Sequence, residues 1–448
     1  MQREILDKDL DVWAIDAYRV AREAGLGRRI NTIMQTCFFQ LMGIMSADEA
    51  IAQIKEAIGR SYRRKGPEVV ERNYAAVDEA VANLAPVPPG RVDATTDRRP
   101  PVPDDAPDFV RRVTGPLLAG RGDALPVSAL PADGTWPTGT AAWEKRNIAD
   151  FVPEWDPELC IQCGQCGAVC PHGVIRAKFF DDTALADAPA GFASAPVSAR
   201  GFPDTRYTLQ IYAEDCTGCA LCVDACPARN IEHPAERAIN MRPKPDDLAP
   251  VREQLAWFEA LPDVDRGHVD FSNIRGVQYL PPLFEFSGAC AGCGETPYLK
   301  LLSQLFGDRA VIANATGCSS IYGGNLPTTP WAKNHEGRGP AWSNSLFEDN
   351  AEFGLGFRLS ADQHRHHAEQ LLRELAPRLE PDLVESLLGA VQDEESEIRA
   401  QRRRVAALRE ALDRLDDARA TRLASLARHL VRRSIWLVGG DGWAYDIG

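Results

Sequence analysis

Two stretches of the chain share one spacing of cysteines, Cys-x-x-Cys-x-x-Cys-x-x-x-Cys-Pro, and no other pattern in the sequence is as specific. The first stretch ends at Pro171 and the second at Pro227. Three thiolates on so short a loop can bind three corners of an iron–sulfur cubane, and the fourth, directly before the proline, ligates the other cluster of a pair. The spacing therefore predicts two [4Fe–4S] clusters with crossed ligands: Cys160, Cys163 and Cys166 with Cys226, and Cys216, Cys219 and Cys222 with Cys170.

Zinc and disulfide bonds are the other interpretations of these eight cysteines. Structural zinc sites take four ligands, usually supplied as two separated pairs, and the doubled spacing does not have that form. Iron–sulfur ligation needs reduced thiolates, which a reducing compartment maintains. We therefore expect a cytoplasmic chain that carries electrons.

Composition narrows the class of protein further. The 448 residues suffice for about three domains, and with 25% charged and 44% hydrophobic residues the chain can bury an ordinary core. The net charge of −14 argues against binding to nucleic acid. The first ten residues lack the apolar run of a secretory signal, and no apolar window of about eighteen residues is present. We expect no membrane span.

The first part of the chain divides into a helical region and a linker. Residues 11–85 alternate short apolar runs with helical patterns, whereas residues 86–140 are dense in proline and glycine and lose periodicity, which predicts a linker or an arm on the surface. The helices that we expect, with their start and stop signals, are 17–23 before Gly25 and Gly27, 47–58 with Ser46 as cap and Glu49 three residues on, and 67–84.

Two further regions follow. Residues 151–240 hold both cysteine motifs, and the stretch 171–215 between them is expected to be a loop lying over the clusters. Residues 241–448 have the pattern of an α/β domain, because the buried-strand candidates 310–312 and 435–438 end in glycine-containing turns. A charged stretch over 361–433 interrupts this pattern, and we expect it to be an inserted helical hairpin that packs on its own protein. Its apolar faces carry Leu408, Leu412 and Leu415, and Leu423, Leu426 and Leu430.

A third group of cysteines is incomplete. Cys290 and Cys293 form a Cys-x-x-Cys pair and Cys318 follows, but a cubane needs four ligands. Cys37 is the remaining candidate, and its apolar surroundings are more typical of an inert buried thiol. We expect the fourth ligand to come from outside this chain.

A glycine-rich segment closes the sequence. The strand candidate 435–438 leads into Gly440, Asp441, Gly442 and Trp443, so a carboxylate follows the carboxyl end of a strand, where α/β sheets bind ligands. Glycines let a diphosphate approach the backbone, and Asp441 can offer one oxygen to Mg²⁺. A tight turn without any ligand is the alternative.

Together these segments resemble the pyruvate:ferredoxin (flavodoxin) oxidoreductases, and the resemblance runs through nearly the whole chain. Glu144-Lys145-Arg146 looks like the signature that links the family's gamma-type domain to its ferredoxin domain. The segments that carry the resemblance are 33–39, 143–149, the two cysteine loops, 290–295, 316–330, 344–354 and 440–448.

The resemblance implies an enzyme that oxidatively decarboxylates pyruvate to acetyl-CoA and carbon dioxide, using thiamine diphosphate, Mg²⁺ and three [4Fe–4S] clusters. By position, Cys290, Cys293 and Cys318 look like three ligands of the third cluster. Glu295 and Cys318 look like contacts of thiamine diphosphate. The loop Gly440, Asp441, Gly442 and Trp443 looks like the diphosphate and magnesium loop, with Asp441 as the metal ligand.

The implied architecture is a multidomain protein of the α+β and α/β classes. Residues 1–85 would be the end of a gamma-type α/β domain, and 86–150 a linker that carries the Glu-Lys-Arg motif. Residues 151–240 would be a two-[4Fe–4S] ferredoxin-like module. Residues 241–448 would be a truncated thiamine-diphosphate-binding α/β domain with 361–433 as its helical insertion.

The family's pyruvate pocket, the fourth cysteine of the third cluster and an asparagine of the magnesium site have no counterpart in the sequence. We therefore expect a fragment, or one piece of a split gene, that is competent at most for electron transfer. The expected partners are ferredoxin or flavodoxin as acceptor, pyruvate and coenzyme A, and a second copy or separate catalytic subunits. The alternatives are a polyferredoxin-type subunit of a split 2-oxo acid oxidoreductase and a non-catalytic gene fragment that folds poorly.

Overall fold

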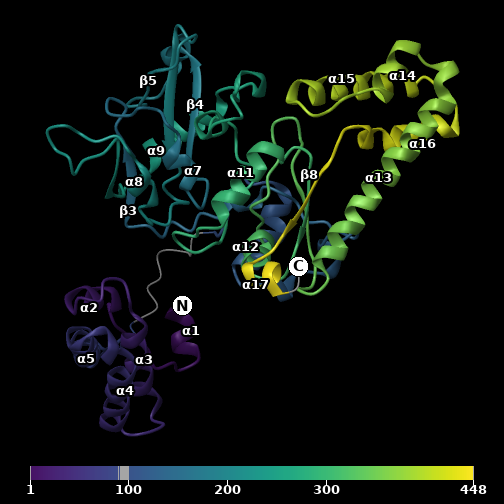
Figure 1. The fold of residues 1–448 in the computed structure, drawn as a ribbon. Coiled ribbons are helices and arrows are strands. Elements are labelled where there is room, and N and C mark those ends of the chain that lie inside the picture. Colours follow the sequence, from purple (N-terminus) through teal and green to yellow (C-terminus); the bar gives the residue numbers. More distant parts are fainter. Residues whose placement is uncertain (1, 89, 91–99, 447–448) are drawn as a thin grey trace. The chain divides into compact units, whose positions relative to one another are not determined.

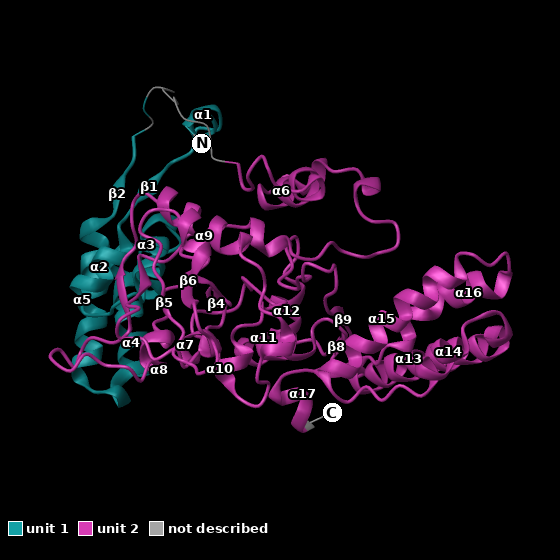
Figure 2. Ribbon diagram, turned by 90° about the horizontal axis from the view of Figure 1, so that it is seen from above, with its two compact units in different colours: residues 1–99 teal, residues 100–448 magenta. Residues whose placement is uncertain are grey.

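The computed structural model describes residues 2–88, 90 and 100–446. The chain forms two compact units, residues 1–99 and 100–448, coloured separately in Figure 2. The division falls inside the proline-rich stretch that the sequence indicated as a linker, and the expected boundaries at 150 and 240 stay predictions. A search of the described residues found no helix with the length and apolar character of a membrane span.

The first unit is mainly helical in its described residues. The three expected helices are confirmed, and the Ser46 hydroxyl accepts a hydrogen bond from the Glu49 amide at 3.3 Å, as the capping pattern predicted. The sequence analysis missed the helix that contains Cys37. The elements are α1 (Gln2–Asp7), β1 (Trp13–Ala14), α2 (Ala17–Glu23), α3 (Asn31–Met42), α4 (Ala47–Tyr62), α5 (Pro67–Asn83) and β2 (Ala85–Pro86), with β1 and β2 antiparallel.

The second unit begins with an arm of short helical turns, of which the longest are Val110–Thr114 and α6 (Gly115–Leu118). The arm is fastened to a distant segment by backbone hydrogen bonds. The Gly139 amide donates to the Trp331 carbonyl at 2.6 Å, and the Ala141 amide to the Thr329 carbonyl at 3.1 Å. The part of the linker that the structure describes therefore lies against the body of this unit.

The region with both cysteine motifs is built from two antiparallel pairings. Strand β3 (Phe151–Trp155) pairs with β7 (Ile239–Pro243), and β4 (Ile175–Asp181) pairs with β6 (Thr205–Ile211), beside which lies the short β5 (Ala195–Pro196). Helix α9 (Ala249–Ala260), labelled in Figure 1, follows β7 along the chain.

The expectation of a loop over 171–215 is therefore wrong. Both long strands are rich in β-branched and aromatic residues, which favour a pleated, half-buried surface. The sequence analysis overlooked that the apolar residues of β4 alternate with charged residues, which is the period of a strand. The charged residues are accommodated because the half-buried Arg176 pairs with Glu285, and Lys178 donates to the Leu261 carbonyl at 2.6 Å.

A three-stranded parallel sheet organises the rest of the unit. Its order is β10-β8-β9, with β8 (Ala310–Asn314) in the centre, β9 (Ala341–Asn344) on one side and β10 (Ser434–Val438) on the other. Both strand candidates from the sequence are confirmed, and β9 was missed. The shorter helices of this part are α10 (Ile274–Val277), α11 (Thr296–Phe306), α12 (Cys318–Gly324) and α17 (Asp441–Asp446), of which α11 and α12 share a hydrophobic core with the sheet.

The stretch before β10 contains four helices rather than a hairpin. The expected leucine faces do meet, because Leu408, Leu412, Leu423, Leu426 and Leu430 share one buried core. Pro381 and Gly389 mark the start and end of one of these helices, and the sequence analysis did not use these turn signals. The helices are α13 (Asn350–Leu375), α14 (Pro381–Leu388), α15 (Glu395–Leu412) and α16 (Ala418–Leu426).

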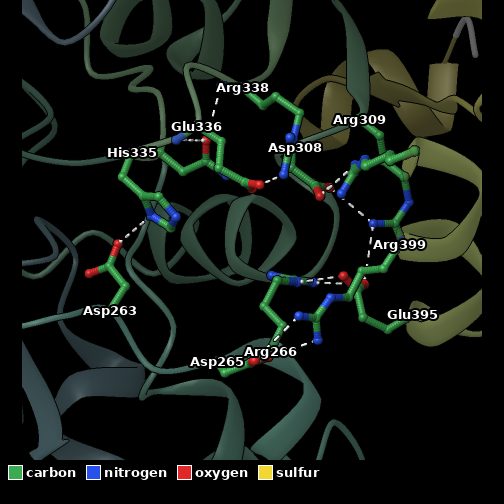
Figure 3. A network of polar contacts seen from close by, with 12 residues as sticks. Asp263, Asp265, Arg266, Asp308, Arg309, His335, Glu336, Arg338, Glu395 and Arg399 are labelled. Atoms are coloured by element: carbon green, nitrogen blue, oxygen red, sulfur yellow. Dashed lines mark hydrogen bonds and ion pairs between the residues drawn. The ribbon is translucent and has the colours of Figure 1, made fainter. Parts of the chain in front are cut away.

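Ion pairs fasten this helical bundle to the rest of the unit (Figure 3). Glu395 at the start of α15 pairs with Arg266 at 3.0 Å, and Arg399, one turn further on, pairs with Asp265 at 2.8 Å. Arg402 pairs at 2.6 Å with Asp308, which lies two residues before the central strand. The bundle is therefore connected electrostatically to the turn that starts β8.

Candidate iron–sulfur centre

The two cysteine loops have the same backbone conformation. Two residues in each have a positive φ, at matching positions: Gln162 (55°) and Gly164 (75°) in the first loop, and Gly218 (69°) and Ala220 (64°) in the second. A positive φ is uncommon for residues other than glycine, and it turns the chain sharply. Each loop curls around a centre before a one-turn helix begins, α7 (Gln165–Val169) or α8 (Leu221–Ala225).

Four cysteines from both loops line one small cavity. Three of them, Cys160, Cys163 and Cys166, come from the first loop, and Cys226 comes from the second. The apolar wall includes Trp155, Tyr207 and Ile239. The structure thus brings together the first set of thiols in the crossed arrangement.

The remaining four cysteines also gather, around Cys216 and Cys222. Burial raises the pKa of Cys222 far above its usual value, and the thiolates of Cys170, Cys166, Cys216 and Cys219 raise it further. Burial likewise raises the pKa of Cys216 to about 11, with Cys170 and Cys219 adding to the shift. Charges influence one another in this way only at short range. The last cysteine of the first loop therefore lies with the first three of the second.

Backbone amides point at the first sulfur of each loop. The Gln162 amide donates to Cys160 Sγ at 3.3 Å, and the Gly218 amide donates to Cys216 Sγ at 3.4 Å. Hydrogen bonds to sulfur stabilise negative charge on it and are one of the determinants of cluster potential. The two loops supply this bond from equivalent positions.

These observations test whether the residues fit an iron–sulfur cluster. All twelve cysteines are free thiols, and among the residues that the structure describes no group of three or more His, Cys, Asp or Glu side chains is placed to hold one metal ion. A cubane holds its four thiolates further apart than a single ion would, because four irons and four sulfides lie between them. A cavity lined by four thiols and apolar side chains fits that larger group.

The third cysteine group lies at the edge of the second loop. A Cβ added to Gly292, whose φ is 77°, would be 3.9 Å from the Cβ of Cys219. Burial raises the pKa of Tyr322 above its usual range, and the charges of Glu295, Cys293 and Cys318 add to that effect. These three residues therefore lie near the hydroxyl group of Tyr322. Cys290 and Cys318 are exposed and Cys293 is half-buried. The three thiols form an open set rather than an enclosed one.

The glycine-rich loop follows the carboxyl end of a strand, as expected. Strand β10 ends at Val438, whose carbonyl accepts a hydrogen bond from the Ala315 amide at 2.8 Å. Helix α12, which begins at Cys318, therefore starts at the same edge of the sheet. Asp441 is exposed, and its Oδ1 accepts a hydrogen bond from the Gly442 amide at 2.9 Å. Since the described residues assemble no donor set around Asp441, they do not by themselves form a magnesium site.

Cys37 belongs to the first unit, where it packs in a hydrophobic core with 5% of its surface exposed. Burial raises the pKa of this thiol, with a backbone hydrogen bond opposing the shift. A buried thiol with a raised pKa is chemically inert. The location agrees with the expected inert role.

Two lysines lie beside the cysteine loops, and only Lys145, as part of the Glu-Lys-Arg motif, was singled out from the sequence. Lys145 pairs at 2.7 Å with Asp215, which directly precedes Cys216, and burial raises the pKa of Asp215 to about 6 although Lys145 lowers it. The Glu-Lys-Arg motif was a signal for this contact. Lys300 is buried and donates to the carbonyls of Gly167 and Ala168, and a single lysine in a helix gives no comparable signal.

Comparisons with known proteins agree with this geometry. A family model described as a 4Fe-4S dicluster domain matches residues 159–230, which contain both cysteine loops. A model described as pyruvate ferredoxin/flavodoxin oxidoreductase matches residues 1–83, and a domain of unknown function named EKR matches 95–149. The chain is homologous to a segment of the pyruvate-flavodoxin oxidoreductases.

Individual relatives match over the full length of this chain. A putative pyruvate-flavodoxin oxidoreductase of Synechocystis is 53% identical over 450 residues, and the pyruvate-flavodoxin oxidoreductase of Rhodospirillum rubrum is 53% identical over 452. The pyruvate:ferredoxin oxidoreductase of Moorella thermoacetica is 41% identical over 464 residues. In each comparison 100% of this chain is covered, and the chain spans 38% of the relative's own length.

Proposed function

We propose that this chain is the electron-transfer segment of a pyruvate:ferredoxin or pyruvate:flavodoxin oxidoreductase. The observation that carries the proposal is the cavity lined by four cysteines from two loops, in a chain whose relatives bear that name. For the whole protein we propose oxidative decarboxylation of pyruvate to acetyl-CoA and carbon dioxide. For this chain, which spans 38% of those relatives, we propose electron transfer alone.

The proposed ligands are crossed between the loops. Cys160, Cys163, Cys166 and Cys226 would hold one [4Fe–4S] cluster, and Cys170, Cys216, Cys219 and Cys222 the other. When bound, such clusters accept and release single electrons at low potential. The chain's own residues fix the two sulfur sets side by side, exclude water with apolar side chains, and donate amide hydrogen bonds to Cys160 and Cys216.

The third group has a different role in the proposal. Cys290, Cys293 and Cys318 would supply three ligands of a further cluster, which would pass electrons to the neighbouring loop of Cys219. Glu295, Cys318 and the loop Gly440, Asp441, Gly442 and Trp443 would contribute to a thiamine diphosphate site, with Asp441 as one magnesium ligand. Their support is the shared edge of the parallel sheet and the exposure of Asp441 and Cys318.

The proposed acceptor is ferredoxin or flavodoxin, and the proposed compartment is the cytoplasm. Pyruvate, coenzyme A and a second copy or separate catalytic subunits belong to the proposal for the whole enzyme. A stand-alone polyferredoxin-type subunit differs from this proposal in one respect: it would bind no thiamine diphosphate even when catalytic subunits are added.

The test is anaerobic reconstitution of residues 1–448 with iron and sulfide. We expect about eight irons per chain and a paramagnetic signal after reduction, because two cubanes hold four irons each. Without further subunits, pyruvate should not drive reduction of a dye. Colourless protein that binds zinc tightly and gives no signal would overturn the cluster assignment, and substantial pyruvate-dependent dye reduction would overturn the restriction to electron transfer.

A further inference from the structure

Lys300 is the most deeply buried lysine near the cysteine loops. It lies on α11, only 1% of its surface is exposed, and its Nζ donates to the carbonyls of Gly167 and Ala168, the latter at 3.2 Å. Both carbonyls belong to α7, the single turn that connects Cys166 to Cys170. These two cysteines fall in different thiol groups, so the ammonium lies where the two groups meet.

The charge of Lys300 has no acidic partner in the part of the chain that the structure describes, where no ion pair involves this residue. Burial lowers its pKa to about 8, while the charges of Cys170 and Cys166 oppose that shift. The two carbonyls that accept hydrogen bonds from Nζ favour the protonated ammonium. A buried charge is costly unless an opposite charge compensates it. The nearby Arg176 is itself a cation, paired with Glu285. With clusters bound, the thiolates of Cys166 and Cys170 would supply the compensation.

We propose that Lys300 is a positioning residue that places one fixed positive charge between the two clusters and makes both easier to reduce. The inference rests on the proposed function, because it requires clusters at both thiol groups. A cubane with four thiolates carries net negative charge, and reduction adds one electron without a proton. A neighbouring cation therefore stabilises the reduced form more than the oxidised form.

The same side chain joins two parts of the unit. Helix α11 begins at Thr296, directly after Glu295 and close to Cys293, so its attachment to α7 fixes the third cysteine group relative to the paired loops. The side chain of Gln278 supports this contact, because it bonds to Gln304 on α11 at 3.2 Å and lies against Gly167. One lysine thus combines a mechanical and an electrostatic role.

The experiment is a redox titration, followed by paramagnetic resonance, of the reconstituted full chain and its variants. In Lys300→Met the midpoint potentials of both clusters should fall by about 59 mV, which corresponds to a tenfold change in the one-electron reduction equilibrium. Lys300→Arg, which keeps the charge, should restore most of the shift. Lys178→Met is the matched control: Lys178 is also buried and also bonds to a carbonyl, that of Leu261, and its loss should leave both potentials unchanged.

The outcomes separate this inference from the proposed function. If the unaltered chain binds no iron, the proposed function fails before Lys300 is tested. If Lys300→Met holds about eight irons with unshifted potentials, the inference is wrong and the lysine is only structural. Should Lys300→Met fail to fold, Lys300→Gln replaces it, because glutamine keeps a donor for the two carbonyls and lacks the charge. The same fall in potential is expected, and an unshifted Lys300→Gln would equally overturn the inference.

Discussion

The paired cysteine loops and the third cysteine group differ in how far the chain encloses them. The eight loop cysteines are all buried or half-buried, and four of them surround one cavity. Cys290 and Cys318 are exposed, and Cys318 begins the helix that follows the central strand of the three-stranded sheet. Each loop gives its last cysteine to the thiol group of the other, so the pair encloses itself. The third group has no such partner loop among the described residues and stays open.

The difference teaches that a repeated motif can complete its own ligand sets, whereas a single motif depends on ligands from elsewhere. If the comparison is correct, changes in the paired loops should abolish whole clusters, and changes at the third group should leave the iron of this chain untouched.

The largest effect is expected from removing cluster ligands. Cys163→Ser and Cys226→Ser should each remove the same cluster, and iron content should fall from about eight to about four per chain. The double variant should lose no more, because both residues serve one cluster. Iron analysis and visible absorption measure this. Cys318→Ser, the control at the open group, should keep all the iron. A double variant that loses both clusters would contradict the crossed arrangement.

Alkylation of the reconstituted chain should show the next largest contrast. Exposed Cys290 and Cys318 should react faster than Cys37 by on the order of a hundredfold, because burial raises the pKa of Cys37 and shields it from the reagent. Peptide mass spectrometry after a short pulse of iodoacetamide gives the relative rates. The comparison would lose its basis if Cys37 were labelled together with Cys318.

The parallel sheet beside the third cysteine group should depend for its stability on ion pairs instead of iron. Asp308 is buried. Burial alone would raise the pKa of this carboxyl group, but the charges of Arg402 and Arg309 hold the pKa below its usual value. Asp308→Asn should lower the free energy of unfolding by about 2–4 kcal/mol, because it leaves the half-buried Arg402 without its carboxylate partner. Asp362→Asn, at an exposed pair with Arg358, should cost less than about 0.5 kcal/mol.

Urea unfolding across the acid range checks the sign of this effect. Because the folded pKa of Asp308 is lowered, its contribution is present above the unfolded value and is lost as pH falls through the folded value. The ion-pair account would fail if Asp308→Asn were as stable as the parent chain at neutral pH.

The smallest effect concerns the helical bundle. His429 stacks on His364 of α13 with ring centroids 4.6 Å apart, and burial, His364, Arg428 and Arg433 lower its pKa to about 4. The neutral ring therefore contributes stability that is present above about pH 6.5 and is lost as pH falls towards 4, by about 1 kcal/mol after allowing for its partial exposure. His429→Gln should abolish this part of the pH dependence in thermal unfolding. An unchanged pH profile would show that another group is responsible.

The sequence predicted the chemistry of this chain better than its local structure. The spacing of the cysteines depends on the geometry of cluster ligation, so both thiol groups could be predicted from the sequence alone. The roles of Arg176 and Lys178 in strand β4 were missed because their partners, Glu285 and Asp263, are distant from them in the sequence. Lys300 was missed for the same reason: a buried cation is recognised only when its surroundings are known.

The matching left-handed residues in the two loops have a consequence for measurement. Gln162 and Gly164 correspond to Gly218 and Ala220, so the backbone of the first cysteine loop is a near copy of the backbone of the second. Each loop can therefore serve as the reference for the other when the potentials of the two proposed clusters are compared. Any gap between the two potentials must therefore originate in what is not duplicated, such as the indole of Trp155 on one side and the charge of Lys244 near Cys216 on the other.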